Sequence, residues 1–302
     1  RIALEGPMVK EKASFILAGR RSYADVLARP FTDIFDNGAA LYFYDLTAKA
    51  NWNVGDKDRV YLSGYFGRDV FKFDARQGFD WGNNTGTLRW NHLFNDRLFS
   101  NFTWVYSNYD YGFSFGEDDL DTFDWSSNIK TYDFKPDFTY FLNAKNELFF
   151  GAEFLLYEFE PANAIGVSNG VATDISLDQK KSLETAFYIG NNQKLTEQLI
   201  AQYGLRYAGF NYLGSGSSYE YATTAPGERK TVINNTTYAN WESIADYHAL
   251  EPRASLRYQL TSYSSLKASY QRMNQFIHLI SNTIAATPID VWQPSTNNIK
   301  PQ

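Results

Sequence analysis

The side chains that could carry out covalent or metal chemistry are few in this sequence and lie far apart. It contains no cysteine, and its three histidines, His92, His248 and His278, lack the close spacing of a zinc site or a Ser–His–Asp triad. The acidic run at residues 117–121 lacks the glycine and the final glutamate of a calcium loop, so a solvated loop is the better interpretation. We therefore expect no catalytic residue, no metal site and no cofactor, and a protein that is not an enzyme.

Two larger sets of side chains could bind a partner. Charged residues recur at alternate positions of several segments, where they could pair across neighbouring strands in a hydrated interior. These residues are Lys49, Arg89, Lys135, Glu153, Arg206, Glu251, Arg253 and Arg257. Aromatic residues in expected loops could stack on sugar rings or a planar chelate, or could equally anchor a membrane interface or pack together. These are Tyr109, Tyr111, Phe113, Phe115 and Trp125.

The segments that carry these residues alternate apolar and polar side chains with a period of two. Between Leu250 and Leu260, every even position is apolar or proline, whereas the odd positions include Glu251, Arg253 and Arg257. Successive side chains of a strand point to opposite faces, so this pattern predicts one apolar and one polar face. The same alternation recurs at residues 42–52, 88–94, 98–107, 133–142, 147–156 and 199–207. Most of these segments approach the roughly 9–11 residues that a tilted strand needs to cross a bilayer.

The composition agrees with strands that have one face in lipid. Aromatic residues make up 18% of the chain, but the mean hydropathy is −0.43 because alternation averages the apolar face away. No run of about 18 apolar residues exists, which excludes a transmembrane helix. The net charge of −6, with acids and bases well mixed, argues against binding to nucleic acid.

The expected connections alternate between short and long. The short ones are residues 55–58, 95–96, 143–146 and 261–263, and the long ones are residues 24–37, 74–84, 117–127, 161–178, 214–247 and 276–302. Outer-membrane barrels have short periplasmic turns and long extracellular loops. The sequence therefore predicts an all-β fold, the wall of an antiparallel transmembrane β-barrel with about a dozen strands, the first at residues 1–5. A soluble β protein does not explain the alternation of loop lengths.

Aromatic residues are expected at both interfaces of such a membrane wall. One girdle beside the short turns would contain Trp52, Phe94, Phe141 and Tyr263. The other, toward the long loops, would contain Tyr44, Tyr106, Tyr109, Tyr132 and Tyr157. We expect His92 to lie on the lipid-facing side near a turn.

Both ends of the sequence look cut. Residues 1–5 resemble part of a strand already in progress, and the polar end at residues 295–302 lacks the terminal aromatic residue usual for such barrels. Lipid offers no partner for an open sheet edge, so a barrel must close. We expect residues 1–302 to be a single segment of a larger barrel, truncated at both ends, which alone forms a curved open sheet.

Several short motifs resemble the barrel of TonB-dependent outer-membrane receptors. They are Leu4-Glu-Gly-Pro-Met8, Lys12-Ala-Ser-Phe15, Gly19-Arg-Arg-Ser-Tyr23, Gly64-Tyr-Phe-Gly-Arg-Asp69, Glu251-Pro-Arg-Ala-Ser255, Ser265-Leu-Lys-Ala-Ser-Tyr-Gln-Arg-Met273 and the stretch 294–302. The resemblance implies a 22-stranded barrel, plugged by an N-terminal globular domain that has no counterpart in this sequence. It also implies that the charged set faces the lumen and the plug.

The resemblance further implies a function and partners. Such receptors import scarce, bulky nutrients (siderophores, cobalamin or glycans) by energy-coupled transport across the Gram-negative outer membrane. The partners would be outer-membrane lipid, the receptor's own plug domain, an inner-membrane energy-coupling complex reached through the missing N-terminus, and a surface lipoprotein. The alternative is a passive porin or a structural or adhesive barrel, which a signal peptide leading directly into strands would favour. An enzyme embedded in a barrel is a more distant alternative, because it needs a nucleophile and a base.

Overall fold

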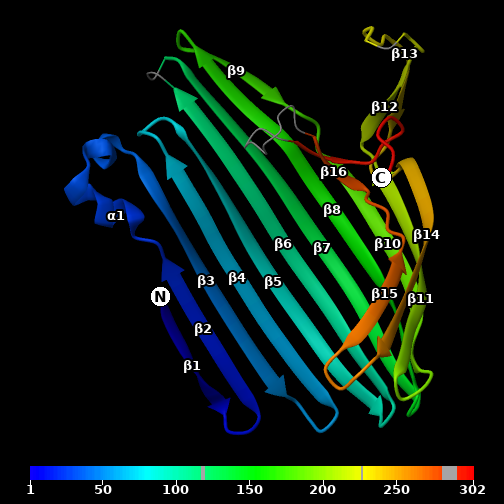
Figure 1. Ribbon diagram of the computed structural model, residues 1–302. Helices are drawn as coiled ribbons and strands as arrows, with labels where there is room; N and C mark the ends of the chain where they lie inside the picture. Colours follow the sequence, from blue (N-terminus) through cyan, green and yellow to red (C-terminus); the bar gives the residue numbers. More distant parts are fainter. Residues whose placement is uncertain (117–119, 226, 281–290) are drawn as a thin grey trace.

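The protein forms one long antiparallel β-sheet (Figure 1). The computed structural model describes residues 1–116, 120–225, 227–280 and 291–302. Twelve strands follow one another across the sheet, each hydrogen-bonded to the next. They are β1 (Ile2–Val9), β2 (Ala13–Arg21), β3 (Ala40–Asn53), β4 (Asp58–Lys72), β5 (Gly78–Asn95), β6 (Leu98–Gly116), β7 (Thr122–Asn143), β8 (Asn146–Ser168), β10 (Lys180–Lys194), β11 (Leu199–Leu213), β14 (Ser243–Gln259) and β15 (Ser265–Gln271).

Smaller elements lie at the end of the sheet opposite the short turns. The strand β9 (Val171–Ser176) pairs with the far end of β8, and β12 (Gly216–Tyr221) pairs with β13 (Val232–Tyr238) in a separate hairpin. The helix α1 (Ala24–Ala28) and two 3-10 turns, η1 (Arg29–Phe31) and η2 (Asp33–Asn37), connect β2 to β3. After β15, the strands β16 (Ile277–Ile280) and β17 (Val291–Pro294) form a third sheet.

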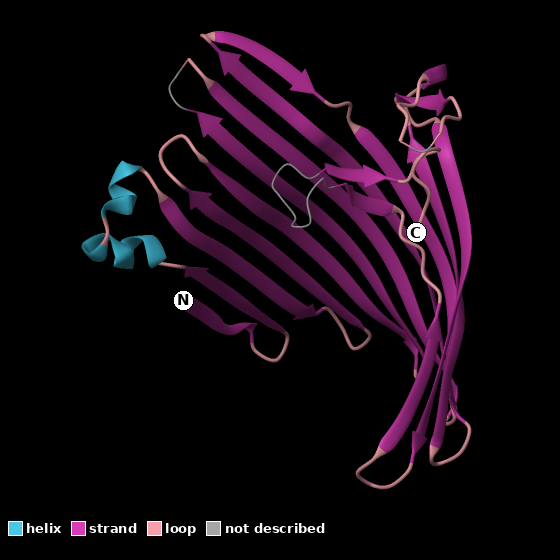
Figure 2. Ribbon diagram, turned by 45° about the horizontal axis from the view of Figure 1, so that its top comes forward, coloured by secondary structure: helices cyan, strands magenta, loops and turns pink. Residues whose placement is uncertain are grey.

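The sheet curves into an open half-pipe, with β1 and β15 at its two edges (Figure 2). The strand β2 pairs with β1 and β3, and β15 pairs with β14, so the two sides of the sheet do not meet. This confirms the expected open sheet. No helix within the described residues is long and apolar enough to span a membrane.

Short polar turns lie together at one end of the strands (Figure 1). In several of them a side-chain oxygen accepts backbone N–H groups: Asn95 Oδ1 from Arg97 and Leu98 at 2.9 and 3.0 Å, and Asn143 Oδ1 from Lys145 at 2.9 Å. Short Asn and Thr side chains replace a backbone turn hydrogen bond in this way. Four of the turns were predicted, and a fifth, at residues 195–198, closes in the same way through Thr196.

At the opposite end, several expected loops are in fact strands. The strand β5 begins at Gly78, β7 begins at Thr122 and β8 continues to Ser168, well inside the predicted loops 74–84, 117–127 and 161–178. The apolar alternation stops there, because these parts of the strands lie beyond the apolar band of the outer face. The first strand is also longer than expected: β1 reaches Val9, and its Pro7 is tolerated in a strand that pairs on one side only within the described chain.

The outer face carries a band of apolar side chains of constant height. On β7 it includes Tyr132, Phe134, Pro136, Phe138 and Tyr140, and the next outward positions away from the short turn, Lys130 and Asn128, are polar. The band continues onto the neighbouring strands. Phe134 of β7 pairs in register with Trp104 of β6 on one side and with Phe154 of β8 on the other. Five outward positions span roughly 30 Å of strand, which a tilt of about 40° reduces to the ~25 Å apolar height of an outer-membrane barrel.

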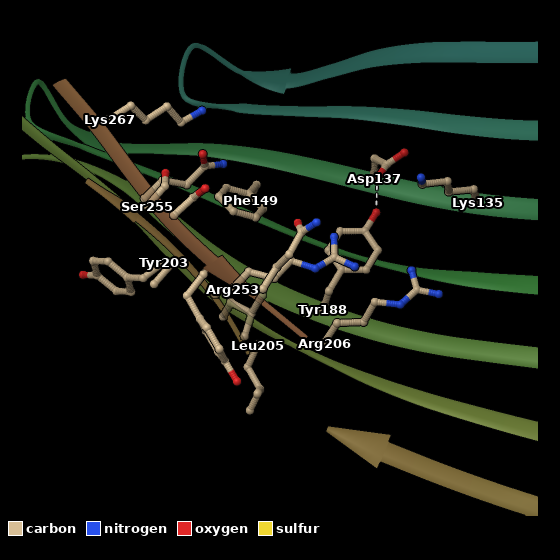
Figure 3. A pocket seen from close by; sticks show the side chains of 17 residues that line it. Lys135, Asp137, Phe149, Tyr188, Tyr203, Leu205, Arg206, Arg253, Ser255 and Lys267 are labelled. Atoms are coloured by element: carbon tan, nitrogen blue, oxygen red, sulfur yellow. Dashed lines mark hydrogen bonds between the residues drawn. The ribbon is translucent and has the colours of Figure 1, made fainter. Parts of the chain in front are cut away.

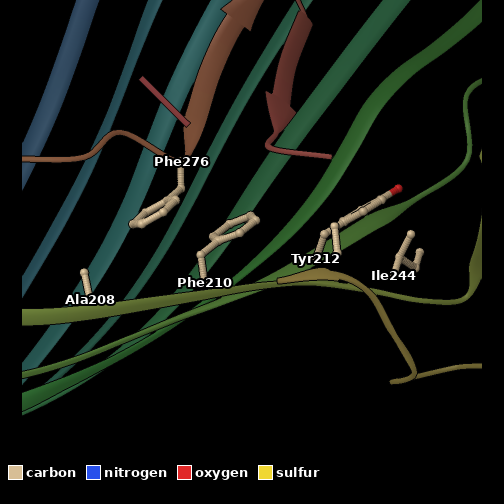
Figure 4. Packing of buried hydrophobic residues seen from close by; sticks show 6 residues of the cluster. Ala208, Phe210, Tyr212, Ile244 and Phe276 are labelled. Carbon is tan, nitrogen blue, oxygen red and sulfur yellow. The ribbon is translucent and has the colours of Figure 1, made fainter. Parts of the chain in front are cut away.

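The chain after β15 folds back over the inner face of the sheet. The ring of Phe276 stacks on Phe210 with centroids 5.0 Å apart, and Phe210 is fully buried (Figure 4). The backbone N–H of Asn274 donates to Glu251 Oε1 at 2.8 Å, and Tyr247 donates its hydroxyl to a backbone oxygen of this segment at 2.7 Å. A small hydrophobic core therefore exists on the wall only where this segment covers it.

Candidate functional site

The inner face of the sheet has three levels of different chemistry. The middle level is a network of ion pairs formed by β7, β8, β11 and β14. Glu153 lies 2.9 Å from Arg206 and 3.9 Å from Lys135, measured between charged atoms. Glu251 lies 3.5 Å from Arg206 and 3.6 Å from Arg253. Five of the eight charged residues predicted to face the lumen therefore form ion pairs: four pair across strands, and Arg253 pairs with Glu251 along β14.

Register explains this network. Arg206 and Glu251 are direct cross-strand partners, and alternation places both on the inner face. Figure 3 shows Arg206 and Lys135 pointing into the same hollow of about 480 Å³. The same figure shows a pair that was not predicted, in which the Tyr188 hydroxyl donates to Asp137. Asp137 occupies an inward position of a predicted strand, so alternation alone could have identified it, whereas Tyr188 belongs to β10, which the predicted segments did not include.

The lower level, near the short turns, contains the other three charged residues. Lys49, Arg89 and Arg257 are exposed, and none forms an ion pair with a carboxylate of the described chain. Lys49 and Arg89 line one hollow of about 320 Å³, and Arg257 lines another of about 440 Å³. Lys267, which was not predicted, lines the second hollow as well. The prediction that these side chains share the inner face is consistent with their register, whereas pairing occurs only at the middle level.

The upper level is aromatic, and it corrects the placement of the five predicted binding residues. Tyr109, Tyr111, Phe113 and Phe115 belong to β6 and Trp125 belongs to β7, so they lie in strands instead of loops. They occupy the odd positions of their strands, which are the inward ones. They are therefore not part of an outward girdle. Tyr109 and Tyr111 are in ring contact at 5.9 Å.

The aromatic surface is wider than the sequence suggested. Phe79 and Trp81 of β5 stack with centroids 5.7 Å apart, and they pair in register with Phe113 and Tyr111. Phe71 of β4 lies 5.0 Å from Phe79 and, with other apolar side chains, lines a hollow of about 510 Å³. Phe79 and Trp81 were missed because residues 74–84 were interpreted as a loop. The alternation Phe79-Asp-Trp81 was the available signal.

The predicted girdles are partly correct. Tyr106 and Tyr132 lie on the outer face with ring centroids 5.3 Å apart, and Tyr44 shares that face. Phe141 and Tyr157 were placed in the girdles by their position along the chain, but both lie at odd, inward positions, as Tyr109 does. Phe141 lines the 440 Å³ hollow.

The histidines do not come together. His92 lies on the outer face as expected, 2.7 Å from Asp58 and edge-on to Phe94. His248 contacts Tyr207 on the outer face, and His278 contacts Ser295 within the returning segment. Among the described residues, no group of three or more His, Cys, Asp or Glu side chains could hold a metal ion. Residues 117–119 of the acidic run lie outside the described residues.

Comparison with known proteins identifies the family to which this chain belongs. The model of the TonB dependent receptor-like β-barrel family matches residues 13–302, and the chain therefore belongs to that family. Members of the family are outer-membrane proteins of Gram-negative bacteria. No curated protein matches the sequence.

Solved receptors share the fold at low sequence identity. The ferric preacinetobactin receptor BauA from Acinetobacter baumannii is 11% identical with a TM-score of 0.63, over 97% of this chain and 47% of that chain. The ferric yersiniabactin uptake receptor FyuA from Yersinia pestis is 10% identical with a TM-score of 0.64, again over 97% and 47%. The ferric citrate transporter FecA is 12% identical with a TM-score of 0.62, over 91% and 40%. This chain therefore spans less than half the length of these structures.

Proposed function

We propose that this chain is part of an outer-membrane receptor that imports a bulky nutrient of the siderophore, cobalamin or glycan class by energy-coupled transport. The observation that carries the proposal is the inward aromatic surface at the upper level, next to the long connections. Aromatic faces bind sugar rings and planar chelates through stacking and apolar contact. Lipid cannot account for this surface, because it lies on the opposite side of the sheet from the apolar band.

The structural neighbours favour a metal chelate within that range. BauA, FecA and FyuA are receptors or transporters of ferric preacinetobactin, ferric citrate and ferric yersiniabactin, respectively. We propose a similar metal-chelate ligand for this receptor, with Trp81 and Trp125 among the side chains that contact it. A passive porin needs a polar constriction, which an aromatic surface does not provide, and so we regard it as the weaker alternative.

The proposal includes the membrane orientation and the partners. The short turns would face the periplasm and the long connections, with the hairpin β12–β13, would face the medium, in the Gram-negative outer membrane. Outer-membrane lipid would cover the apolar band. A plug domain of the same receptor would fill the lumen and contact the charged set, and an inner-membrane complex would supply energy through it. A surface lipoprotein is a further proposed partner at the extracellular end.

Two tryptophans provide a matched test of ligand binding. Trp81 points inward at the upper level, whereas Trp104 points outward and stacks on Phe134. In the full-length receptor, we expect Trp81→Ala to weaken binding of a ferric siderophore about tenfold, since stacking on one ring contributes on the order of 1–3 kcal/mol. Binding is measured by titrating a panel of ferric siderophores, cobalamin and maltooligosaccharides. Trp104→Ala should leave the affinity unchanged; equal effects of the two variants, or no binding by any panel member, would contradict the proposal.

A further inference from the structure

On the lower level of the inner face, five cations that line the hollows form no ion pair within the described residues. The lower cationic surface consists of Lys49, Arg89, Lys194, Arg257 and Lys267. Each is exposed, and each lies within six residues of the end of its strand at a short turn. None forms an ion pair with a carboxylate of the described chain. The whole chain has a net charge of −6, so this surface has the opposite sign to its average.

Two of these cations oppose each other directly. Arg257 of β14 and Lys267 of β15 are register partners on the same face. Like charges placed directly opposite across two strands destabilise a sheet. The carboxylates that line the neighbouring hollows are Asp137, which is bonded to Tyr188, and Glu147. The wall itself therefore leaves positive charge uncompensated at this level.

The extent of the surface indicates the size of its partner. It reaches from Lys49 on β3 to Lys267 on β15, which is nine strand-to-strand steps along the sheet. At about 4.8 Å per step this is roughly 40 Å, too far for one small anion to contact. A folded domain can present several carboxylates over such a distance. Lipid encloses the outer face, so such a domain has to lie inside the barrel.

We propose that the lower cationic surface binds an acidic face of the domain that fills the lumen. This inference rests on the proposed function, because it takes the plug as the occupant, and it adds the sign of the charge on the plug. In the network above it, around Arg206, each cation already has a carboxylate partner, so this network contributes less to the attraction. Attraction is therefore concentrated near the periplasmic end.

Thiol labelling of the full-length receptor tests the inference. Ser255 lines the two hollows next to Arg257, and this chain contains no cysteine, so Ser255→Cys introduces a defined probe. We expect slow modification by a neutral maleimide when the plug is docked. The double variant Arg257→Glu, Lys267→Glu reverses the charge of this cross-strand pair. The two side chains still carry like charges, so their repulsion destabilises the wall as it does in the unreversed receptor. The labelling rate should rise about tenfold, as it should in high salt.

Two further variants make the result decisive. Lys267→Glu alone creates a cross-strand ion pair with Arg257, which stabilises the wall and should still accelerate labelling. The control is Lys57→Glu with Arg97→Glu, two exposed turn residues that line none of the hollows, and it should leave the rate unchanged. Slow labelling that is insensitive to charge reversal would overturn the inference. Rapid labelling of the unreversed receptor by an anionic thiosulfonate would also overturn it, because the surface would then be open to small anions.

Uptake measured in the same variants separates this inference from the proposed function. A receptor that imports none of the tested nutrients, but protects Ser255→Cys in a charge-dependent way, would refute the import proposal alone. A receptor that imports its nutrient, but shows no charge dependence of labelling, would refute the acidic-plug inference alone.

Discussion

The outer and inner faces of the same strands differ in how uniform they are. Across β3 to β14, the outer face repeats a run of mostly apolar positions followed by polar ones, for example from Tyr140 to Lys130 on β7. The inner face changes along each strand, from cations near the short turns, through ion pairs such as Arg206–Glu251, to aromatic rings such as Trp81. One solvent, the lipid, explains the first face. The second requires different partners at different heights, which is why the binding surfaces are sought there.

The largest effect expected from this difference comes from placing a charge on each face of one strand. Leu256 belongs to the outer band and Ser255 to the inner face. We expect Leu256→Arg in the full-length barrel to cost up to about 2–4 kcal/mol of folding free energy, the cost of a guanidinium in the hydrocarbon at the middle of the bilayer. Ser255→Arg should cost much less, since the lumen is hydrated. Equilibrium folding into bilayers measures both, and equal costs would mean that the faces are wrongly assigned.

A smaller effect is expected from removing one charge of the middle network. Glu251 is buried, accepts the Asn274 N–H at 2.8 Å and lies within reach of Arg206 and Arg253. Glu251→Gln retains the size of the side chain but removes its charge, so we expect a loss of about 1–2 kcal/mol. Glu5→Gln is the matched control: Glu5 is exposed and forms no ion pair within the described chain. Denaturant titration of the full-length receptor measures both, and similar losses would show that the network contributes no specific stability.

The fold could be predicted from the sequence where lipid imposes its pattern. Alternation identified the strand around Leu256 and its neighbours, because one face must be apolar for about ten residues. Turn chemistry identified the ends at Asn95 and Asn143, where a side-chain oxygen has to close the turn. Beyond the band the outward positions become polar and only short inward runs such as Phe79-Asp-Trp81 still alternate, so the strand ends containing Phe79 and Trp125 were interpreted as loops.

The candidate site was harder to predict for the same reason. Alternation along each strand decides which residues share the inner face. The sequence could therefore place Arg206 and Glu251 on the same face. Which inward residues meet depends on the register of neighbouring strands, and irregularities such as the one between Leu93 and Asn95 shift the register of β5 against β6. The pairing of Trp81 with Tyr111, and of Arg257 with Lys267, became visible only with the strands aligned.

The smallest expected effect concerns the upper edge of the outer band, where Tyr106 and Tyr132 pair at 5.3 Å. Such aromatic pairs contribute about 0.5–1.5 kcal/mol beyond burial. In a double-mutant cycle of Tyr106→Ala and Tyr132→Ala, we expect a coupling free energy in that range when the receptor folds into bilayers. The inward cross-strand rings Phe113 and Phe123, 6.5 Å apart, provide the comparison. Lipid headgroups order only the outer pair, so replacing the bilayer with detergent should weaken its coupling but leave that of the inner pair unchanged. If both couplings fell together, the upper edge of the lipid band would have to lie elsewhere on the wall.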